Sequence, residues 1–586
     1  MGLSPLAPSG RKRARELLVT PNLPVDRHRE MVPSHATLRI MTRGKRSPKQ
    51  VPSSLMEGCT GNTRKLRRSR FGPLLMVLAA VVMAVGQAAS AAQAFTTETG
   101  TLWGPVLEWE VENPAYSGNP FDVIADVAFT HVESGQSHET QMFYASDDLW
   151  KFRFTGTRTG EWTFETVSDD ADLDGLKGTV VIEENPDADV RGFLVSDGNQ
   201  FAIQSGDDGA VSATLYNVYY NHPDDTHQLH HYSLDREETR RQINVVLDEL
   251  ESHGLQATFI EPRHSWFSYG AESHRDHDSV DPDPESFRIL ETIIMEAHKR
   301  GLHVHIWKWG DEERRWTPHG VGGINGEADR RLQRYIASRL GPLPGWTMSY
   351  GFDLQEWVEP DEVRDWHAYM HDHLGWPRLL MAREEIGSPP TDFFTPGEMD
   401  VFSNDERFID NQDFYDQALR DLGEEPSRPV LYERRFHHTR DDIWDMDHTR
   451  RALWQFTLAG GAGAIWGVLW ADAEDAEPYP NPEQLLTHRE FWRDRFLLGM
   501  ERANDLSDGY VLREPESDSY VFYKEGTSAI ELDLSGMDRP LPAIAVDTKR
   551  RYEEIKVGEL NAEAQVWTAP YESDWALAVG SFEEPE

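Results

Sequence analysis

Two glutamates stand where a pair of carboxylates could cleave the bond between two sugars. Glu356 lies in the segment YGFDLQEW (350–357), and Glu433 lies in the segment RPVLYERR (428–435). Hydrolysis of a glycosidic bond needs one carboxylic acid that protonates the leaving oxygen and a second carboxylate that attacks the sugar or activates water. Because each Glu stands at the end of a predicted strand, the two segments indicate chemistry of this kind at one edge of a sheet.

Other polar and aromatic side chains at strand ends are candidate sugar-binding residues. Sugar sites combine rings with a few polar groups, but core packing or a surface ion pair explains any one of these residues equally well. Two further carboxylates, Glu359 and Glu384, are the reserve acids. The candidate substrate-binding residues are Arg263, His264, Trp307, Trp309, Gln355, Arg383 and Trp470.

Metal chemistry is a competing explanation for one pair of histidines. His303 and His305 share one face of a predicted strand, and this spacing suits Zn²⁺ or another divalent ion. The pair begins the third predicted strand without an obvious further ligand set, so we expect no metal and no cofactor. Cys59 is the only cysteine and precedes the folded part, which excludes an intrachain disulfide and a thiol nucleophile there.

Strands that alternate with helices after about residue 196 must position these side chains. Amphipathic stretches separate eight short apolar runs, and one of them, Phe287 to Ala297, stops before Gly301. Eight strands in about 270 residues predict a (β/α)₈ barrel within 196–504, with the active site at the carboxyl ends of the strands. No Gly-rich phosphate loop follows the first strand, which argues against a doubly wound sheet. The predicted strands are 213–219, 255–261, 302–308, 346–353, 378–383, 399–403, 429–433 and 463–469.

The placement of Glu356 and Glu433 resembles clan A of the glycoside hydrolases. Members of that clan keep an acid/base Glu after the fourth barrel strand, usually preceded by Asn, and a nucleophile Glu at the end of the seventh. The resemblance implies that Glu356 is the acid/base and Glu433 the nucleophile of a retaining β-glycoside hydrolase, with Trp470 rather than Trp466 as a sugar platform. Gln355 replaces the usual Asn, so we expect the hydrogen bond to the sugar 2-hydroxyl to be reshaped.

Strand patterns also flank the predicted barrel. Alternating apolar residues predict a β-sandwich over 95–195. Its segments FYASDDLWKFRF (143–154) and TGEWTFET (159–166) resemble the immunoglobulin-like domain that precedes many bacterial glycoside-hydrolase barrels. Alternation returns in 505–586, which resembles the small β-sandwich that follows such barrels. The sequence therefore predicts three folded domains: an N-terminal β-sandwich, a central (β/α)₈ barrel and a small C-terminal β-sandwich.

A basic leader precedes the predicted domains. We expect residues 1–55 to be an untranslated or disordered extension. Residues 56–94 have the order of a signal peptide, because an apolar run follows several Arg and Lys residues and ends in Ala-Gln-Ala before Phe95. The apolar run is short for a membrane span. We therefore expect a periplasmic or secreted protein with no membrane attachment after cleavage.

The charge of the chain restricts its partners. The formal net charge is -43, and residues 1–94 contain 16 Lys and Arg against 4 Asp and Glu, which leaves about -55 on the rest. Nucleic acid is excluded as a partner because phosphate backbones need a basic surface, and a poly- or oligosaccharide substrate is expected instead. Two alternatives stay open: a polysaccharide lyase on a similar scaffold, and a barrel that binds glycans without turnover.

Overall fold

The computed structural model of the protein describes most of the chain from Phe95 to Phe582, so the predictions for 1–55 and 56–94 lie outside the described residues. The described residues all belong to one compact unit. No helix within the described part is both long and apolar enough to cross a membrane. The described residues are 95–187, 189–213, 217–218, 227–310, 315–351, 354–384, 399–404, 414–424, 426–432, 446–461 and 483–582.

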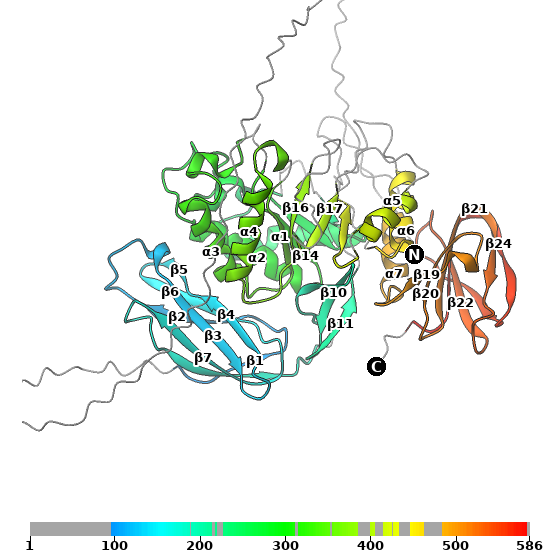
Figure 1. Ribbon diagram of the computed structural model, residues 1–586, viewed down its shortest axis with the longest axis horizontal. Helices are drawn as coiled ribbons and strands as arrows, with labels where there is room; N and C mark the ends of the chain where they lie inside the picture. Colours follow the sequence, from blue (N-terminus) through cyan, green and yellow to red (C-terminus); the bar gives the residue numbers. More distant parts are fainter. Residues whose placement is uncertain are drawn as a thin grey trace, which may run out of the picture. The chain divides into compact units, whose positions relative to one another are not determined.

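Two sheets enclose a common apolar core in the N-terminal region (Figure 1). Every second side chain of β3 (Ala125–His131) is buried, as the alternation of the sequence predicts. The rings of Trp109 and Phe152 stack in this core with their centroids 5.2 Å apart. The arrangement is consistent with the predicted β-sandwich, while its immunoglobulin-like character stays a prediction. The sheets are β1 (Glu98–Thr101), β8 (Lys177–Glu183), β7 (Gly160–Ser168), β3 and β4 (Ser137–Gln141), and β2 (Leu107–Glu112), β6 (Leu149–Phe154) and β5 (Phe143–Ser146), each in spatial order.

A parallel sheet of seven strands lies at the centre of the fold. β12 to β18 pair in the order of the sequence, and every neighbouring pair is parallel. Each of these strands overlaps the range predicted for it. The strands are β12 (Asn217–Val218), β13 (Ala257–Ile260), β14 (His303–Trp307), β15 (Trp346–Ser349), β16 (Leu380–Glu384), β17 (Val401–Asn404) and β18 (Val430–Tyr432).

The prediction of a closed (β/α)₈ barrel is wrong for the part of the chain that the structure describes. β12 and β18 are the two edges of the sheet, and no described strand joins them. The eighth predicted strand, 463–469, lies outside the described residues. Strands that alternate with helices predict a parallel sheet, but closure depends on how the first and last strands meet, and neither strand carries a local signal for that pairing.

Helices pack against one face of the parallel sheet (Figure 1), and their ends follow local signals. Asp235 caps the first helix by accepting from the N–H of Glu238 at 2.9 Å. The second helix begins after the N-cap Asp283 and ends before Gly301, whose φ of 68° suits glycine. The helices are α1 (Arg236–Ser252), α2 (Pro284–His298), α3 (Glu327–Leu340), α4 (Pro360–His373), α5 (Phe414–Glu424), α6 (Met446–Leu458) and α7 (Glu483–Trp492).

The opposite face of the parallel sheet, called the inner face below, has its own apolar cluster. Met381, Val401 and Leu431 belong to this cluster, and neighbouring residues such as Leu380 and Val430 belong to the clusters on the helical side. Successive strand residues point to opposite faces, which explains the division. A small antiparallel sheet closes the inner cluster through residues that include Phe201. Its strands are β9 (Leu194–Asp197), β10 (Gln200–Ser205) and β11 (Gly209–Ser212).

The C-terminal region is one six-stranded antiparallel sheet in the described residues, where the sequence predicts a small β-sandwich. One face packs on helices, with the rings of Trp454 and Tyr523 stacked at 5.3 Å. The other face surrounds a separate cluster that contains Phe522 and Trp575. The two longest strands contribute side chains to both clusters, and register shifts interrupt their pairing. The alternation of the sequence alone does not reveal that one sheet has two apolar faces. The spatial order is β19 (Glu501–Arg502), β20 (Tyr510–Glu514), β21 (Ser519–Asp533), β24 (Ala564–Val579), β22 (Leu541–Asp547) and β23 (Ile555–Leu560).

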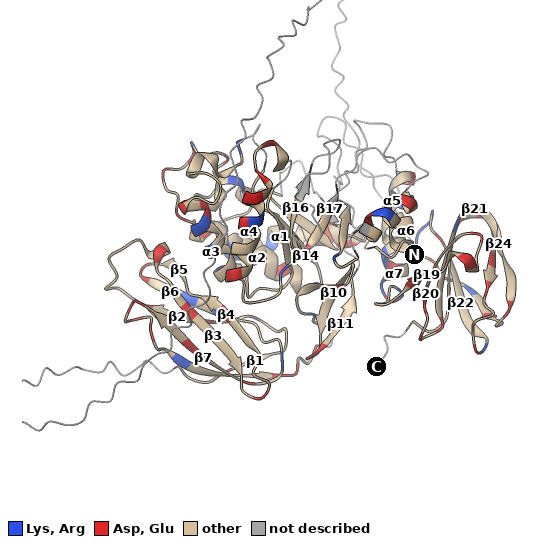
Figure 2. Cartoon of the chain, viewed as in Figure 1, with Lys and Arg blue, Asp and Glu red and all other residues tan. Residues whose placement is uncertain are grey.

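Acidic residues are distributed over all regions, with basic residues among them (Figure 2). Many pairs are local, such as Arg241 and Glu238 one turn apart on α1. Exposed pairs of this kind contribute little to stability. Acidic residues are therefore not confined to one region of the described chain (Figure 2).

Candidate active site

Residues of types that could take part in catalysis or binding lie where the strands of the parallel sheet end. Glu261 directly follows β13, and Trp307 ends β14. Glu356 follows β15 in the short 3₁₀ helix η5 (Leu354–Glu356), and Arg383 lies one residue before the end of β16. Parallel strands bring their carboxyl ends to one edge of a sheet, where α/β enzymes carry their active sites. We call this edge the carboxyl edge.

Glu261 and Arg263 form a buried charged pair at the carboxyl edge. The Nε of Arg263 donates to Oε2 of Glu261 at 3.1 Å. Arg263 is 8% exposed and Glu261 is 3% exposed. The Arg263 guanidinium lies over the ring of Trp316, 3.5 Å from its centroid. With its amide oxygen turned toward Arg263, Gln228 accepts from Nη1 and Nη2 at 3.1 and 2.9 Å. These partners hold the guanidinium in one orientation.

The backbone of Arg263 is also constrained. Its φ of 52° lies in the left-handed region, which costs a residue other than glycine about 1–3 kcal/mol. Such strain persists where the surroundings hold the residue in place, and it is common at ligand sites. The conformation turns the chain from β13 into the 3₁₀ helix η3 (Arg263–Trp266) and fixes the direction of the side chain.

An aromatic wall stands beside this pair. Phe259 of β13 and Trp307 of β14 meet edge to face with their centroids 4.4 Å apart, and Trp316 packs against the cluster that they form. Trp307 is 3% exposed. The structure thus brings Trp307 and Arg263, two predicted substrate-binding residues, to the same edge of the sheet.

His264 and Trp309 lie deeper than their predicted role requires. His264 contacts His277 through Nδ1 at 3.1 Å and the carbonyl of Arg315 through Nε2 at 3.2 Å. Burial lowers the pKa of His264 to about 4, against the effect of the Arg315 carbonyl, so the ring is neutral at neutral pH. The Nε1 of Trp309 donates to Asp329 at 3.3 Å within the core. Both side chains are therefore part of the buried structure that supports the carboxyl edge.

Glu356 is exposed on η5, and the preceding Gln355 is half-buried. Solvent access suits a group that exchanges its proton with substrate and water. The reserve acid Glu359 has a structural explanation, because it is the N-cap residue of α4 and its N–H donates to Oε2 of Glu362 at 3.0 Å. Glu359 therefore has a structural role as a helix cap, and the assignment of Glu356 as the acid/base stays a prediction.

Three predicted residues cannot be placed in the site. Glu433 and Trp470 lie outside the described residues, and only the backbone of Arg383 is described. The distance between the carboxyl groups of Glu356 and Glu433 therefore stays a prediction.

His303 and His305, the competing metal pair, are buried. Nδ1 of His305 lies 2.9 Å from the hydroxyl of Thr347. Burial lowers the pKa of each histidine to about 3, so both rings are neutral at neutral pH. Among the described residues, neither belongs to a group of three possible metal ligands.

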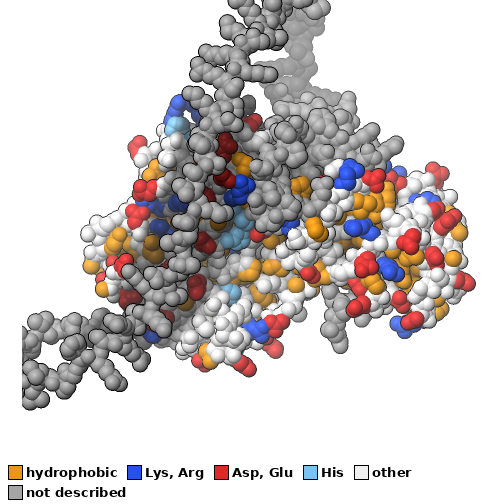
Figure 3. All heavy atoms as spheres, in the orientation of Figure 1, with side chains coloured by type: hydrophobic (Ala, Val, Ile, Leu, Met, Phe, Trp, Pro, Cys, Tyr) orange, Lys and Arg blue, Asp and Glu red, His pale blue; other side chains and the backbone are white. Residues whose placement is uncertain are grey.

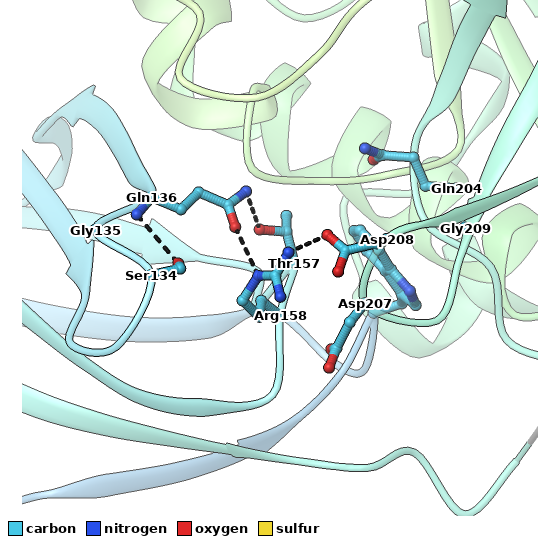
Figure 4. A pocket seen from close by; sticks show the side chains of 10 residues that line it. Ser134, Gly135, Gln136, Thr157, Arg158, Gln204, Asp207, Asp208 and Gly209 are labelled. Carbon is cyan, nitrogen blue, oxygen red and sulfur yellow. Dashed lines mark hydrogen bonds and ion pairs between the residues drawn. The ribbon is translucent and has the colours of Figure 1, made fainter.

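A polar cavity of about 530 Å³ lies away from the parallel sheet (Figure 4). Loops between strands of the N-terminal sheets and the β10–β11 hairpin line it, and none of the lining residues belongs to β12–β18. Gln136 donates to Thr157 at 3.1 Å, and Arg158 pairs with Asp208. Internal bonds thus occupy much of its polar lining, and the cavity is separate from the carboxyl edge.

Comparison with known proteins gives the class of protein that this chain resembles. Residues 225–498 match the model of an apiosidase-like catalytic domain, and residues 101–169 match a domain of unknown function, DUF5060. A candidate glycoside hydrolase from Bacteroides vulgatus is similar in structure over 82% of this chain and 99% of its own, with 13% identity and a TM-score of 0.64. A glycoside hydrolase family 5 protein from the same organism covers 67% of this chain and 93% of its own, with 13% identity and a TM-score of 0.50. No curated protein matches the sequence significantly.

The two kinds of similarity support different statements. At 13% identity the solved structures show a common fold. The catalytic-domain match contains Glu261, Trp307 and Glu356 of the carboxyl edge, and it supports a glycoside hydrolase.

Glu261 is a candidate site residue that sequence reasoning missed. It is the last residue of the predicted strand 255–261 and the only charged one there. A carboxylate at the end of an apolar strand is the same signal that selected Glu356. Its pairing with Arg263 and the proximity of Trp316 needed the tertiary structure.

Proposed function

We propose that this protein is an exported glycoside hydrolase that cleaves a β-glycosidic bond with retention of configuration. The observation that carries the proposal is the coincidence of the catalytic-domain match with a carboxyl edge that holds a preorganised Arg263, an aromatic wall and the exposed Glu356. Sugar sites combine such rings with a few fixed polar groups.

Glu433 acts as the nucleophile in this proposal, and Glu356 acts as acid and then as base. Glu433 attacks the anomeric carbon while Glu356 protonates the leaving oxygen, and Glu356 then activates the water that releases the sugar. Support for Glu433 comes from the sequence, because it stands two positions after Leu431, whose side chain belongs to the inner-face cluster. Trp470 is proposed as the sugar platform on the same basis.

Arg263, Trp307 and Trp316 bind and orient the sugar rather than react with it. The guanidinium of Arg263 is held by the carboxylate of Glu261. Its fixed N–H groups suit hydroxyl or carboxylate substituents. Rings beside it offer apolar faces to a pyranose or furanose.

A substrate panel tests the proposal. The exported protein is incubated with aryl α- and β-glycosides, including apiosides because of the apiosidase-like match, and with plant and marine polysaccharides. Reducing-end release should occur on at least one β-linked substrate, and the first product observed by NMR should be the β-anomer. Products that absorb in the near ultraviolet would instead identify a lyase, and binding without any release would identify a glycan-binding protein.

A further inference from the structure

Two histidines and one aspartate converge outside the carboxyl edge. His367 and His371 stand one turn apart on α4, and Asp400 immediately precedes β17. Nε2 of His371 lies 2.9 Å from Oδ2 of Asp400, and Nε2 of His367 lies 3.6 Å from Oδ1. One possible ligand atom from each residue lies within 4.8 Å of the others. Figure 3 shows histidine side chains near the middle of one face of the molecule.

The residue types and their supports fit a metal site. Two imidazoles and a carboxylate are ligands that Zn²⁺ accepts, with a water completing a tetrahedral set. Nδ1 of His367 lies 3.2 Å from the Tyr350 hydroxyl, so that donation from Nδ1 leaves the lone pair of Nε2 for a cation. Oδ2 of Asp400 accepts from the N–H of Leu380 at 2.8 Å, which orients the carboxylate.

A simple ion pair explains only part of this arrangement. One protonated histidine satisfies one carboxylate, yet here two rings approach the same carboxylate and stand 4.5 Å apart between their centroids. Two protonated rings at that distance would repel each other. A divalent ion between neutral rings removes the repulsion and uses all three side chains.

We propose that His367, His371 and Asp400 bind one divalent transition-metal ion, of which Zn²⁺ is the expected example. The ion fastens α4 to the start of β17. Asp400 stands at the amino end of its strand, whereas the candidate active site lies at the carboxyl edge. The role is therefore structural, and it does not depend on the proposed hydrolysis.

Metal retention by the whole exported protein tests this site. The protein is stripped with EDTA, dialysed against Zn²⁺ and then against metal-free buffer, and the zinc is measured by mass spectrometry. The wild type should retain one ion per chain, and His371→Ala and Asp400→Asn should lose it. His373→Ala is the matched control on the same helix, because Nδ1 of His373 bonds to the carbonyl of Tyr369 at 2.8 Å and His373 is not one of the three grouped residues. A wild type without zinc, or retention in both ligand variants, overturns the proposal.

Two further measurements add a readout on the folded wild type, and each variant is compared only if it shows a cooperative melting transition. Added Zn²⁺ should raise the Tm of the wild type and of His373→Ala, and should leave the Tm of Asp400→Asn unchanged. Co²⁺ in the wild type should show the visible absorption of a tetrahedral site, and Asp400→Asn should not. Zinc binding that survives in Asp400→Asn and disappears in His303→Gln would move the metal to the other histidine pair and reject this site.

Discussion

Arg153 of β6 reaches the carboxylate of Glu291 in α2, with Nη1 donating to Oε1 at 2.7 Å. Both side chains are buried, and Arg339 of α3 donates to the same carboxylate. Burial alone would raise the pKa of Glu291, but the charges of Arg153 and Arg339 outweigh burial and lower the pKa to about 2. One buried carboxylate therefore joins the N-terminal sheets to the helices that pack on the parallel sheet.

Glu291→Gln should destabilise the protein by about 3–5 kcal/mol, because it leaves two buried guanidinium groups without their counter-charge. Urea unfolding measures the change. Glu108→Gln is the control, since Glu108 binds the other side of Arg153 but is 29% exposed at its side chain, and it should cost less than about 1 kcal/mol. Equal costs for the two variants would mean that burial does not matter here.

Buried histidines should make the protein lose stability as the pH falls below about 6.5. Burial lowers the pKa of His303 and His305 to about 3, so the unfolded chain takes up their protons first. Each histidine then removes up to about 1.4 kcal/mol per pH unit between its unfolded and folded pKa. His305→Gln should flatten the curve of unfolding free energy between pH 6.5 and 5, measured by urea titration. A slope equal to that of the wild type would contradict the assignment.

The carboxylate pair should behave as a retaining site, with the two carboxyl groups about 5–5.5 Å apart. Glu433→Ala should abolish turnover on every substrate. Glu356→Ala should still turn over substrates with activated leaving groups, which need no proton in the first step. Azide should rescue this variant and give a product of retained configuration.

An experimental structure and steady-state rates decide the assignment. A separation above about 10 Å, beyond both retaining and inverting classes, or near-normal activity in both variants would reject the pair. Glu384 would then be the next acid to test, because Glu359 already serves as a helix cap.

Low salt should lower the Tm of the exported protein. A net charge near -55 on residues 95–586 produces self-repulsion, which counter-ions screen over about 10 Å at 0.1 M ionic strength. Melting curves in a sodium chloride series provide the measurement. A midpoint that does not move with salt would show that the acidic surface is neutral to stability.

The exported protein should begin near Phe95, because the preceding residues have the order of a signal peptide. Intact-mass spectrometry of protein recovered outside the cytoplasm gives the N-terminus. A mass that includes residues 73–94 would identify a retained membrane anchor instead.

The sequence by itself determined the features that depend on near neighbours in the chain. Alternation predicted the buried face of β3, helical spacing and Gly301 predicted α2 and its end, and apolar runs predicted the positions of β12–β18. Each of these signals acts over a few residues, because the pleat of a strand and the turn of a helix repeat locally. Glu356 was selected in the same way, from its position after a strand.

Only the tertiary structure decided what depends on residues far apart. The described sheet is open where eight strands predicted closure, because pairing of the first and last strands is not encoded in either one. Arg263 and Trp316 are brought together although more than 50 positions separate them in the sequence. Asp400, which precedes β17, contacts His371 of α4 although β16 lies between them in the sequence. Side chains at such separations meet only after the backbone has been arranged by packing, so no local pattern in the sequence specifies them.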